Sequence, residues 1–346
     1  MQRRIPVKRH KSQDTVGIKA PSGEPGPKVF QLTLVFFTTD VHGSERCFMK
    51  FVNSAGFYKA DVLILGGDVT GKMIIPLVEQ ADGCRTAEFA GQMTTVRTQG
   101  ECDALVKTIR FSGYYPYLTT KDEMDDLNAN PKKVDALFTR MMGETMERWM
   151  KIAEERLKPK GVKCFITPGN DDRFIIDEAL SRSNYVQNPE GKVVWVDEDH
   201  EMISMGWSNP TPWNSPRETS EEDLGKKIEA MASQVKNMPF CIFNMHCPPK
   251  DTPLDPAPKI GKNLKAKTSG GASEMISAGS SAVRNTILKY QPLLGLHGHI
   301  HESKAATNLG RTLCLNPGSE YGEGVLRGAL ITLTKKGYKS YLFTQG

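Results

Sequence analysis

The segment Leu293–Glu302, which reads LLGLHGHIHE, holds the densest group of side chains in this chain that can bind a metal. Its apolar start predicts a buried strand, and three of the chain's seven histidines follow, as His297, His299 and His301. This density favours a metal site over a polar loop with incidental histidines. Alternate residues of an extended segment point the same way, so His299 and His301 are predicted to face one pocket. Gly298 between them is predicted to let the backbone come close to an ion.

Four other predicted strands also end in residues that bind metals. Their β-branched, aromatic and aliphatic residues predict buried strands at 31–39, 61–65, 162–167 and 240–245. The metal-binding residues that follow them are Asp40 and His42, Asp68, Asn170, and His246. A single Asp or His in such a place is commonly a cap or a hydrogen-bonding group. Five strands that end alike instead predict one shared site, because the carboxyl ends of parallel strands meet at one edge of a sheet.

The composition of this ligand set indicates which metals it suits and how many. The predicted ligands are seven side chains: Asp40, His42, Asp68, Asn170, His246, His299 and His301. Mixed carboxylate and imidazole donors suit divalent manganese, iron, zinc or nickel, and one carboxylate can bridge two ions. A site for two divalent metal ions with one bridging carboxylate needs a set of this size.

The elements that must position these residues follow an α/β pattern. A predicted strand, helix and strand over 31–65 form a βαβ unit with polar residues at its carboxyl edge. The pattern pauses at 72–120, where short segments predict an antiparallel meander, and 101–111 predicts a helix that Tyr114–Tyr117 breaks. We interpret 72–120 as an insertion over or beside the site, not as a separate functional domain. Further elements are predicted as helices at 131–157, 224–235 and from Ser280 or Ser281 to Tyr290, a hairpin at 193–207, and closing strands at 329–334 and 338–343.

The net charge of +5 comes from the first 28 residues, which hold seven of the 45 Lys and Arg but two of the 40 Asp and Glu. The rest of the chain, 29–346, is neutral and has no basic stripe of the kind that lines a nucleic-acid groove. We expect the basic tail 1–28 to be disordered and dispensable for catalysis, because it has few apolar residues to offset the entropy cost of ordering.

Cysteine usage and hydropathy indicate the cellular setting. The seven cysteines are an odd number with no CxxC pair, and most lie in apolar runs. No apolar run approaches the ~20 residues of a membrane span, and the N-terminus has no signal-peptide pattern. We therefore expect a cytoplasmic protein with reduced, buried thiols and no membrane partner, and the oligomeric state stays open.

Five motifs, in this order, resemble those of the calcineurin-like metallophosphoesterases. The family pattern is D-x-H, G-D, G-N-H/D, a lone histidine after a strand, and G-H-x-H. The matching residues here are Asp40–His42, Gly67–Asp68, Gly169–Asp172, His246 and Gly298–His301, and Asn316–Ser319 resembles the turn after the family's last histidines. The resemblance covers residues 30–343 apart from 72–120, and looks most like uncharacterised prokaryotic members. It implies a four-layer αββα sandwich of two mixed sheets flanked by helices, as one domain over 29–346 with a β-rich insertion.

The resemblance also implies a function: hydrolysis of a small phosphoester at two metal ions, with a phosphodiester favoured over a monoester. The ligands implied for the first ion are Asp40, His42 and His301. Those implied for the second are Asn170, His246 and His299, with Asp68 bridging the two. A hydroxide between the ions would attack phosphorus in line. Catalytic roles are expected for Asp68, Asn170 and Asp171, whereas His297 lies outside the pattern and is predicted to support the site structurally.

Asp171 departs from the family pattern. Many members carry histidine at this position, where it contacts phosphate or protonates the leaving oxygen. An ionised carboxylate would repel an anionic phosphate, so we expect Asp171 to be protonated by its surroundings, with Asp172 as a neighbour, or to face elsewhere. Other branches of the family also lack this histidine. Hydrolysis therefore stays implied, with weaker expulsion of poor leaving groups.

Substrate contacts are predicted in two loops. The loop 247–277 is interpreted as too irregular to be core, and it starts beside His246. Of its lysines, Lys262 and Lys265 are predicted to meet a phosphate or a second anionic group of the substrate, the alternative being a solvated surface loop. Asn209 lies in a second loop, which is predicted to edge the cleft.

Two other functions stay open at this point. A non-catalytic metal-binding scaffold of the same fold, like the retromer subunit of similar fold, would keep the ligands without turnover. The complete ligand set disfavours the scaffold, and Asp171 favours it. A nuclease is disfavoured by the neutral charge of residues 29–346.

Overall fold

The structure is a computed structural model, and it describes residues 32–261, 265–269 and 272–346. The predicted basic tail 1–28 and Lys262 lie outside these residues. Within them, no helix combines the length and the apolar composition that crossing a membrane requires. All seven cysteines are buried and free, as predicted.

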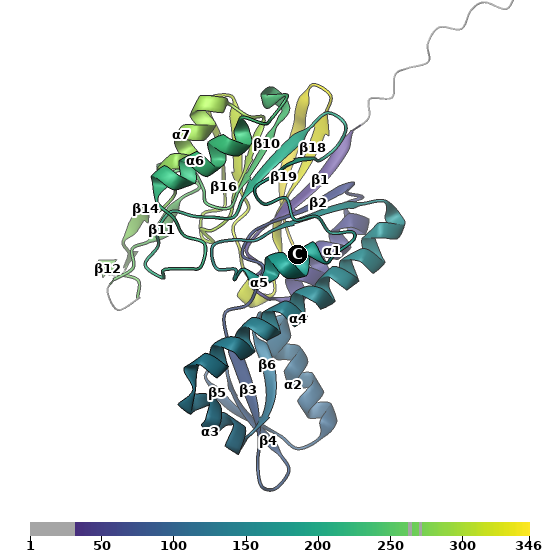
Figure 1. Ribbon diagram of the computed structural model, residues 1–346, viewed down its shortest axis with the longest axis vertical. Helices are drawn as coiled ribbons and strands as arrows, with labels where there is room; N and C mark the ends of the chain where they lie inside the picture. The colour runs from purple at the N-terminus through teal and green to yellow at the C-terminus, as the bar shows by residue number, and fades with distance from the viewer. Residues whose placement is uncertain (1–31, 262–264, 270–271) are drawn as a thin grey trace, which may run out of the picture. The chain divides into compact units, whose positions relative to one another are not determined.

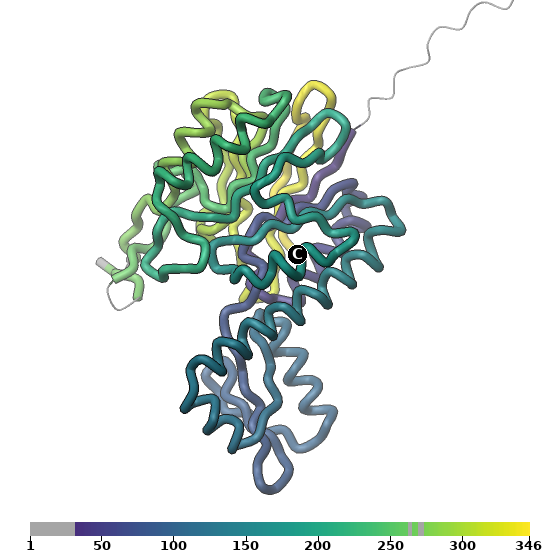
Figure 2. The backbone as a smooth tube through the Cα atoms, in the orientation of Figure 1, coloured from purple at the N-terminus to yellow at the C-terminus, as the bar shows by residue number. Residues whose placement is uncertain are grey.

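One five-stranded sheet carries three of the five predicted ligand-bearing strands. Its strands, in spatial order, are β19 (Gly337–Gln345), β18 (Arg327–Thr334), β1 (Thr33–Thr38), β2 (Val62–Gly66) and β7 (Lys163–Thr167). β1, β2 and β7 are parallel, so their carboxyl ends lie at the same edge. β18 runs antiparallel to β1, which places the yellow C-terminal strands beside the purple β1 in Figure 2.

A second, six-stranded sheet carries the other two ligand-bearing strands. Its order is β16 (Ala305–Leu309), β17 (Thr312–Asn316), β15 (Leu294–Leu296), β10 (Ile242–Met245), β9 (Glu201–Met205) and β8 (Val193–Trp195). β9, β10, β15 and β17 are mutually parallel, and β16 and β8 are antiparallel edge strands. The hairpin predicted at 193–207 is β8 and β9.

The two sheets pack face to face, and helices cover both outer faces (Figure 1). Between the sheets, Phe37 and Phe165 of the first contact a core that includes Ile242 and Leu296 of the second. The outer face of the first sheet is covered by α1 (Glu45–Phe57), α4 (Pro131–Leu157) and α5 (Ile175–Ser181), and that of the second by α6 (Glu221–Ala232) and α7 (Ser281–Tyr290). The predicted α/β sandwich of two mixed sheets flanked by helices is therefore confirmed.

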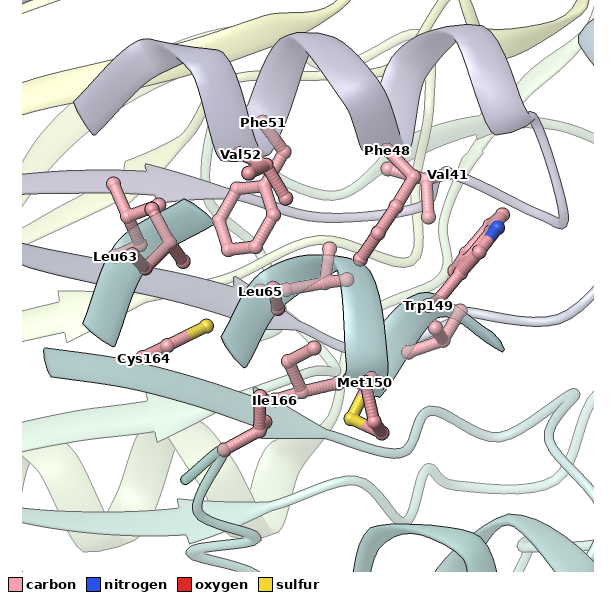
Figure 3. Packing of buried hydrophobic residues seen from close by; sticks show 14 of the residues in the cluster. Val41, Phe48, Phe51, Val52, Leu63, Leu65, Trp149, Met150, Cys164 and Ile166 are labelled. Atoms are coloured by element: carbon pink, nitrogen blue, oxygen red, sulfur yellow. The ribbon is translucent and has the colours of Figure 1, made fainter. Parts of the chain in front are cut away.

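The outer core of the first sheet is built mainly from aromatic and aliphatic side chains (Figure 3). Phe48 of α1 stacks on Trp149 of α4 with ring centroids 4.1 Å apart. Both rings are fully buried and pack with Leu65 and Ile166, which lie near the ends of β2 and β7. Burying such side chains stabilises the fold by roughly 1.5–3 kcal/mol each. Packing of α1 and α4 against β2 and β7 therefore holds the strands that carry the predicted ligands in place.

The inserted segment forms its own sheet with its own small core. Its strands are, in spatial order, β5 (Gln92–Val96), β4 (Arg85–Phe89), β3 (Ile74–Glu79) and β6 (Tyr115–Thr120). α2 (Gln99–Phe111) packs on this sheet through Cys102 and Ile109, and α3 (Lys121–Ala129) follows directly after the predicted boundary at 120.

Two local predictions were wrong. Tyr114–Tyr117 was predicted only to break a helix, but 115–120 form the strand β6, parallel to β3. Its aromatic residues favour strands, and its proline is tolerated because β6 lies at the sheet edge. The loop 247–277 was interpreted as outside the core, but Leu254 and Asp255 are fully buried. The Asp255 carboxylate accepts hydrogen bonds from the backbone N–H groups of Asp251 and Thr252 in its own loop, which makes its burial possible.

Candidate metal centre

All seven predicted metal ligands meet in one cluster. Within each of two groups, the donor atoms lie within 4.8 Å of one another, and both groups include Asp68. The first group is Asp40, His42, Asp68 and His301, and the second is Asp68, His246 and His299. Asn170 joins the second group through its Oδ1, which lies 2.7 Å from His299 Nδ1. The cluster is buried except at His299 and His301, so its opening to solvent lies on their side.

The predicted ligands come from the carboxyl edges of two sheets, not of one as predicted. Asp40, Asp68 and Asn170 follow strands of the first sheet, whereas His246 and His299 follow strands of the second. The face-to-face packing of the sheets brings the two edges together. His299 and His301 were predicted to face one pocket because they are alternate residues of an extended strand, and this reason was also wrong. The strand β15 ends at Leu296, and His299 lies in a turn with φ of 67°.

The backbone at the cluster adopts conformations that residues other than glycine rarely take. Asp40, His42, Asp68 and His299 have φ angles of 54°, 39°, 50° and 67°. Left-handed conformations of this kind cost roughly 1–3 kcal/mol each and persist only where the surrounding structure holds them. These are four of the nine such non-glycine residues in the described part of the chain. Strain is thus concentrated at the residues whose side chains are aimed into the cluster.

In the first group, nitrogen and oxygen atoms approach one another as ligands of a shared cation do. His42 Nε2 lies 3.0 Å from His301 Nε2 and 3.5 Å from Asp68 Oδ2. Asp40 Oδ1 lies 3.3 Å from His301 Nε2. Donor atoms bound to one ion at about 2.1 Å are separated by roughly 3.0–3.4 Å. Two imidazole nitrogens in such contact need a proton or a metal ion between them.

The second group has the same spacing around the amide oxygen of Asn170. His246 Nε2 lies 3.1 Å from Asn170 Oδ1 and 3.4 Å from Asp68 Oδ1. The two oxygens of Asp68 therefore face different groups, Oδ1 toward His246 and Oδ2 toward His42. A carboxylate in this position can bridge two ions. The donor set of carboxylate, amide and imidazole fits divalent transition metals.

The electrostatics of the cluster favour a bound cation. Burial opposes charge on His246, but the neighbouring Asp68 and Asp40 carboxylates outweigh it and raise the pKa of His246 to about 10. Burial lowers the pKa of His299 to about 4, which keeps that ring neutral and able to donate a lone pair. Burial would raise the pKa of Asp40, yet the hydrogen bond from His301 and the charges of the histidines lower it. The carboxylates are thus held ionised beside nitrogen donors.

Hydrogen bonds behind the ligands fix the orientation of His246. Its Nδ1 lies 3.0 Å from the carbonyl of Gly66 at the end of β2, so Nδ1–H donates there and Nε2 faces the cluster. His297 is fully buried, and burial lowers its pKa to about 4. The Nδ1–H of this neutral ring donates to the carbonyls of Met245 and Cys247, which flank His246. His297 therefore holds the backbone that carries a predicted ligand.

We expect His297→Ala to weaken metal binding by roughly 10–100-fold, because the carbonyls on both sides of His246 lose their donor. His297→Asn should restore part of the affinity, since an amide nitrogen can reach the position of Nδ1. Titration of the apo-protein with Mn²⁺ measures both variants. Equal affinities in His297→Ala and the wild type would mean that His297 has no part in holding the site.

The turn Asn316–Ser319 clamps the last two histidines in place. Asn316 Nδ2 donates to the carbonyls of Gly298 and Ile300, and Ser319 N donates to the carbonyl of His301. Gly298 is required by close packing, since a Cβ there would lie 2.4 Å from Asp40 Oδ2. Its role differs from the predicted approach to an ion: the missing side chain lets the backbone reach the Asp40 carboxylate.

Asp172 does not face the cluster and instead ties two ligand loops together. Its buried carboxylate accepts hydrogen bonds from Val69 N, Thr70 N and Oγ1, and Gly169 N, at 2.6–2.9 Å. Burial and the nearby charge of Asp68 raise its pKa to about 6. Asp172 thereby links the loop after Asp68 to the loop that carries Asn170.

We expect Asp172→Ala to destabilise the protein by about 3 kcal/mol or more, because each buried N–H left without an acceptor costs roughly 1–3 kcal/mol. Urea unfolding measures this change in the free energy of unfolding. Asp122→Ala, on the exposed side of α3, is the matched control and should change stability little. A shift no larger than that of the control would show that the loops do not depend on this carboxylate.

Asp171 faces the opening of the cluster and has a cationic partner. Its Oδ2 lies 2.7 Å from Lys72 Nζ and 4.0 Å from His42 Nδ1. Its Oδ1 accepts hydrogen bonds from Ser215 Oγ and Asn170 Nδ2. The carboxylate is therefore not turned away, and an ion pair balances its charge.

Sequence reasoning missed three residues around the site, of which Lys72 and Tyr321 lie at its opening and Arg217 is buried behind it. Lys72 follows Asp68 by four positions. This closeness in sequence was the one feature that could have indicated a place for Lys72 at the site. Tyr321 packs against the ring of His42 with centroids 4.6 Å apart. Arg217 is buried, and its backbone N donates to the carbonyl of Asn170 while its Nε donates to that of Asp172. Nothing in the sequence indicates that this arginine is buried beside the site.

The structure gives less support to the residues that were predicted to contact substrate than to the predicted metal ligands. Asn209 uses both ends of its amide inside the protein, since Nδ2 donates to the carbonyl of Ala278 and Oδ1 accepts from the Cys247 thiol. Lys265 is exposed in the loop that follows β11 (Pro256–Pro258). Contacts of Asn209 and Lys265 with substrate remain predictions.

Comparison with known proteins supports the fold. No protein-family model matches the sequence. The uncharacterized protein MJ1162 of Methanocaldococcus jannaschii is 30% identical over 159 residues, which are 45% of this chain and 64% of the relative, so the chain spans less than two thirds of that protein's length. One crystal structure aligns with 91% of this chain and 99% of its own, with a TM-score of 0.54 and 15% identity.

Two further solved structures are similar over most of their lengths. TT1561 of Thermus thermophilus has a TM-score of 0.49 and 14% identity, over 91% of this chain and 99% of its own. YfcE, a phosphoesterase from E. coli, has a TM-score of 0.31 and 10% identity, over 90% of this chain and 98% of its own. At such low identities a structural likeness concerns the fold alone.

Proposed function

We propose that this protein is a phosphoester hydrolase that depends on two divalent metal ions. The observation that carries the proposal is the pair of donor groups joined by Asp68, whose two oxygens face different histidines. The ordered motifs of the sequence, which resemble those of calcineurin-like metallophosphoesterases, support the same reading. A structural ion-pair network would not need two histidine nitrogens 3.0 Å apart.

The seven predicted ligands would be divided between the two ions. Asp40, His42 and His301 would hold one ion, and Asn170, His246 and His299 the other. Asp68 would bridge both. Two divalent ions in such a site lower the pKa of water to give a nucleophile and neutralise charge on the phosphoryl oxygens. The protein's own part is to keep His42 and His299 neutral by burial and to aim four of the seven donor side chains through a strained backbone.

A phosphodiester is the favoured substrate class, and the reason is the charge at the opening. Asp171 presents a carboxylate there, at 24% side-chain exposure. A monoester carries up to two negative charges on its phosphoryl group and a diester carries one. The diester therefore meets less repulsion from Asp171.

A panel of phosphoesters assayed with manganese, nickel, zinc and magnesium tests this proposal. We expect hydrolysis of bis(4-nitrophenyl) phosphate after metal loading, loss of activity on chelation, and two equivalents of metal per chain. Full metal content with no turnover on any phosphoester would instead favour the non-catalytic scaffold. A chain that binds no metal would contradict the site itself.

A further inference from the structure

The entrance of the metal cluster carries a lysine whose surroundings are built to hold it. Lys72 lies between Gly71 and Met73, directly before β3. Gly71 N donates to Tyr115 Oη at 2.7 Å, and Tyr115 N donates to the Met73 carbonyl at 2.9 Å. Both sides of Lys72 are thus attached to β6 of the inserted sheet. A Cβ on Gly71 would lie 2.2 Å from the Gly113 carbonyl, so the approach is close.

We propose that Lys72 contacts the phosphoryl oxygens of the substrate and that Asp171 positions its ammonium group. The inference rests on the proposed function, since it requires a phosphoryl group at the metal cluster. It also gives the inserted sheet a role, because its junction with the main domain fixes the backbone of Lys72.

The contacts of the ammonium group leave it free to bind an anion. It has three N–H donors, and Asp171 Oδ2 is its ion-pair partner among the described residues. The Lys72 side chain is 47% exposed, so a small anion can reach it from solvent. His42 Nδ1 lies 4.0 Å from the same carboxylate oxygen, which places Lys72 beside the ligands predicted for the first ion.

The charges explain how Asp171 can stand beside an anionic substrate. The ammonium group of Lys72 offsets part of the repulsion between the Asp171 carboxylate and a phosphate, and the repulsion that is left is smaller for a singly charged diester than for a monoester. Burial lowers the pKa of Lys72, but the charges of Asp171 and Asp68 outweigh it and raise that pKa. The group therefore keeps its proton and supplies positive charge and hydrogen bonds, not a proton.

Binding of inorganic phosphate to the manganese-loaded protein, measured by calorimetry, tests the proposal without relying on turnover. We expect Lys72→Met to weaken phosphate binding by roughly 10–100-fold, the usual effect of losing one charge-assisted hydrogen bond. Lys72→Arg should retain more affinity than Lys72→Met. Lys121→Ala removes one exposed positive charge from α3 and should leave phosphate affinity within about twofold. Metal content should equal that of the wild type in all variants.

The role of Asp171 is tested by the double variant. If Asp171 acts through Lys72, Asp171→Asn should weaken phosphate binding in the wild type but not in Lys72→Met, where it removes only the repulsion of an unpaired carboxylate. Additive effects would mean that Asp171 does not position Lys72.

The outcomes separate this proposal from the proposed function. Unchanged phosphate affinity in Lys72→Met, or no phosphate binding by the wild type, would overturn the contact with Lys72. Phosphate binding that depends on Lys72, with no phosphoester hydrolysed, would uphold the contact and overturn the enzymatic function.

Discussion

Asp68→Asn is expected to remove both metal ions and with them hydrolysis of any phosphoester. The two carboxylate oxygens lie 3.5 Å from His42 Nε2 and 3.4 Å from His246 Nε2, so one side chain serves both donor groups. An amide offers one oxygen and no charge. Changes behind the ligands commonly cost 10–100-fold in metal affinity, and loss of a shared charged ligand should cost more than about 100-fold.

Elemental analysis of the purified variant measures this effect, with turnover of an aryl diester as a second readout. Asp61→Asn is the matched control, because Asp61 lies beside the other end of β2 and bonds to Leu34 N. The control should retain two metals per chain. Two metals and normal turnover in Asp68→Asn would remove the bridging role.

The second large effect concerns the leaving group. With aspartate and not histidine at position 171, that position offers no imidazole to protonate a departing alkoxide, and the neighbouring Lys72 ammonium group holds its proton more tightly than a free lysine does. Missing general-acid catalysis typically costs roughly 10²–10⁴-fold, and the loss is small when the leaving group is acidic. Diesters with a nitrophenolate leaving group should therefore be cleaved far faster than alkyl diesters. Asp171→His should narrow that gap.

Rates for a series of diesters, plotted against leaving-group pKa, measure the prediction. Asp125→His, on the exposed side of α3, is the control and should reproduce the wild-type slope. If a protonated Asp171 were itself the acid, Asp171→Asn would lose alkyl-ester activity selectively. A plot that is flat, and unchanged in both variants at position 171, would leave this position without a role in leaving-group departure.

The residues of the cluster were predictable because each follows a short apolar run that had to be a buried strand. The position of a residue after a predicted strand depends only on the local sequence. The high density of histidines around His299 can likewise be recognised from the sequence alone. The convergence of two sheets was not predictable in the same way. It depends on strand order, such as β7 beside β2 and β15 between β10 and β17, and contacts far apart in sequence decide that order.

The surroundings of the site were harder to predict because their contacts are long-range and their residue types are ambiguous. Lys72 resembles a surface lysine at the start of an insertion until its ion pair with Asp171 is seen. Tyr115 was interpreted as a helix breaker because its strand partner, β3, lies before the intervening helix α2. Asp172 and Asp171 are adjacent and chemically identical, yet one is fully buried and bonded to backbone while the other faces the opening.

An anomalous difference map from crystals grown with manganese tests the two-metal centre most directly. The account predicts two peaks per chain, about 3.5–4 Å apart, one on each side of the Asp68 carboxylate. One peak should contact His42 and His301, and the other His246 and His299. A single peak, no peak, or peaks that do not touch Asp68 would contradict the account.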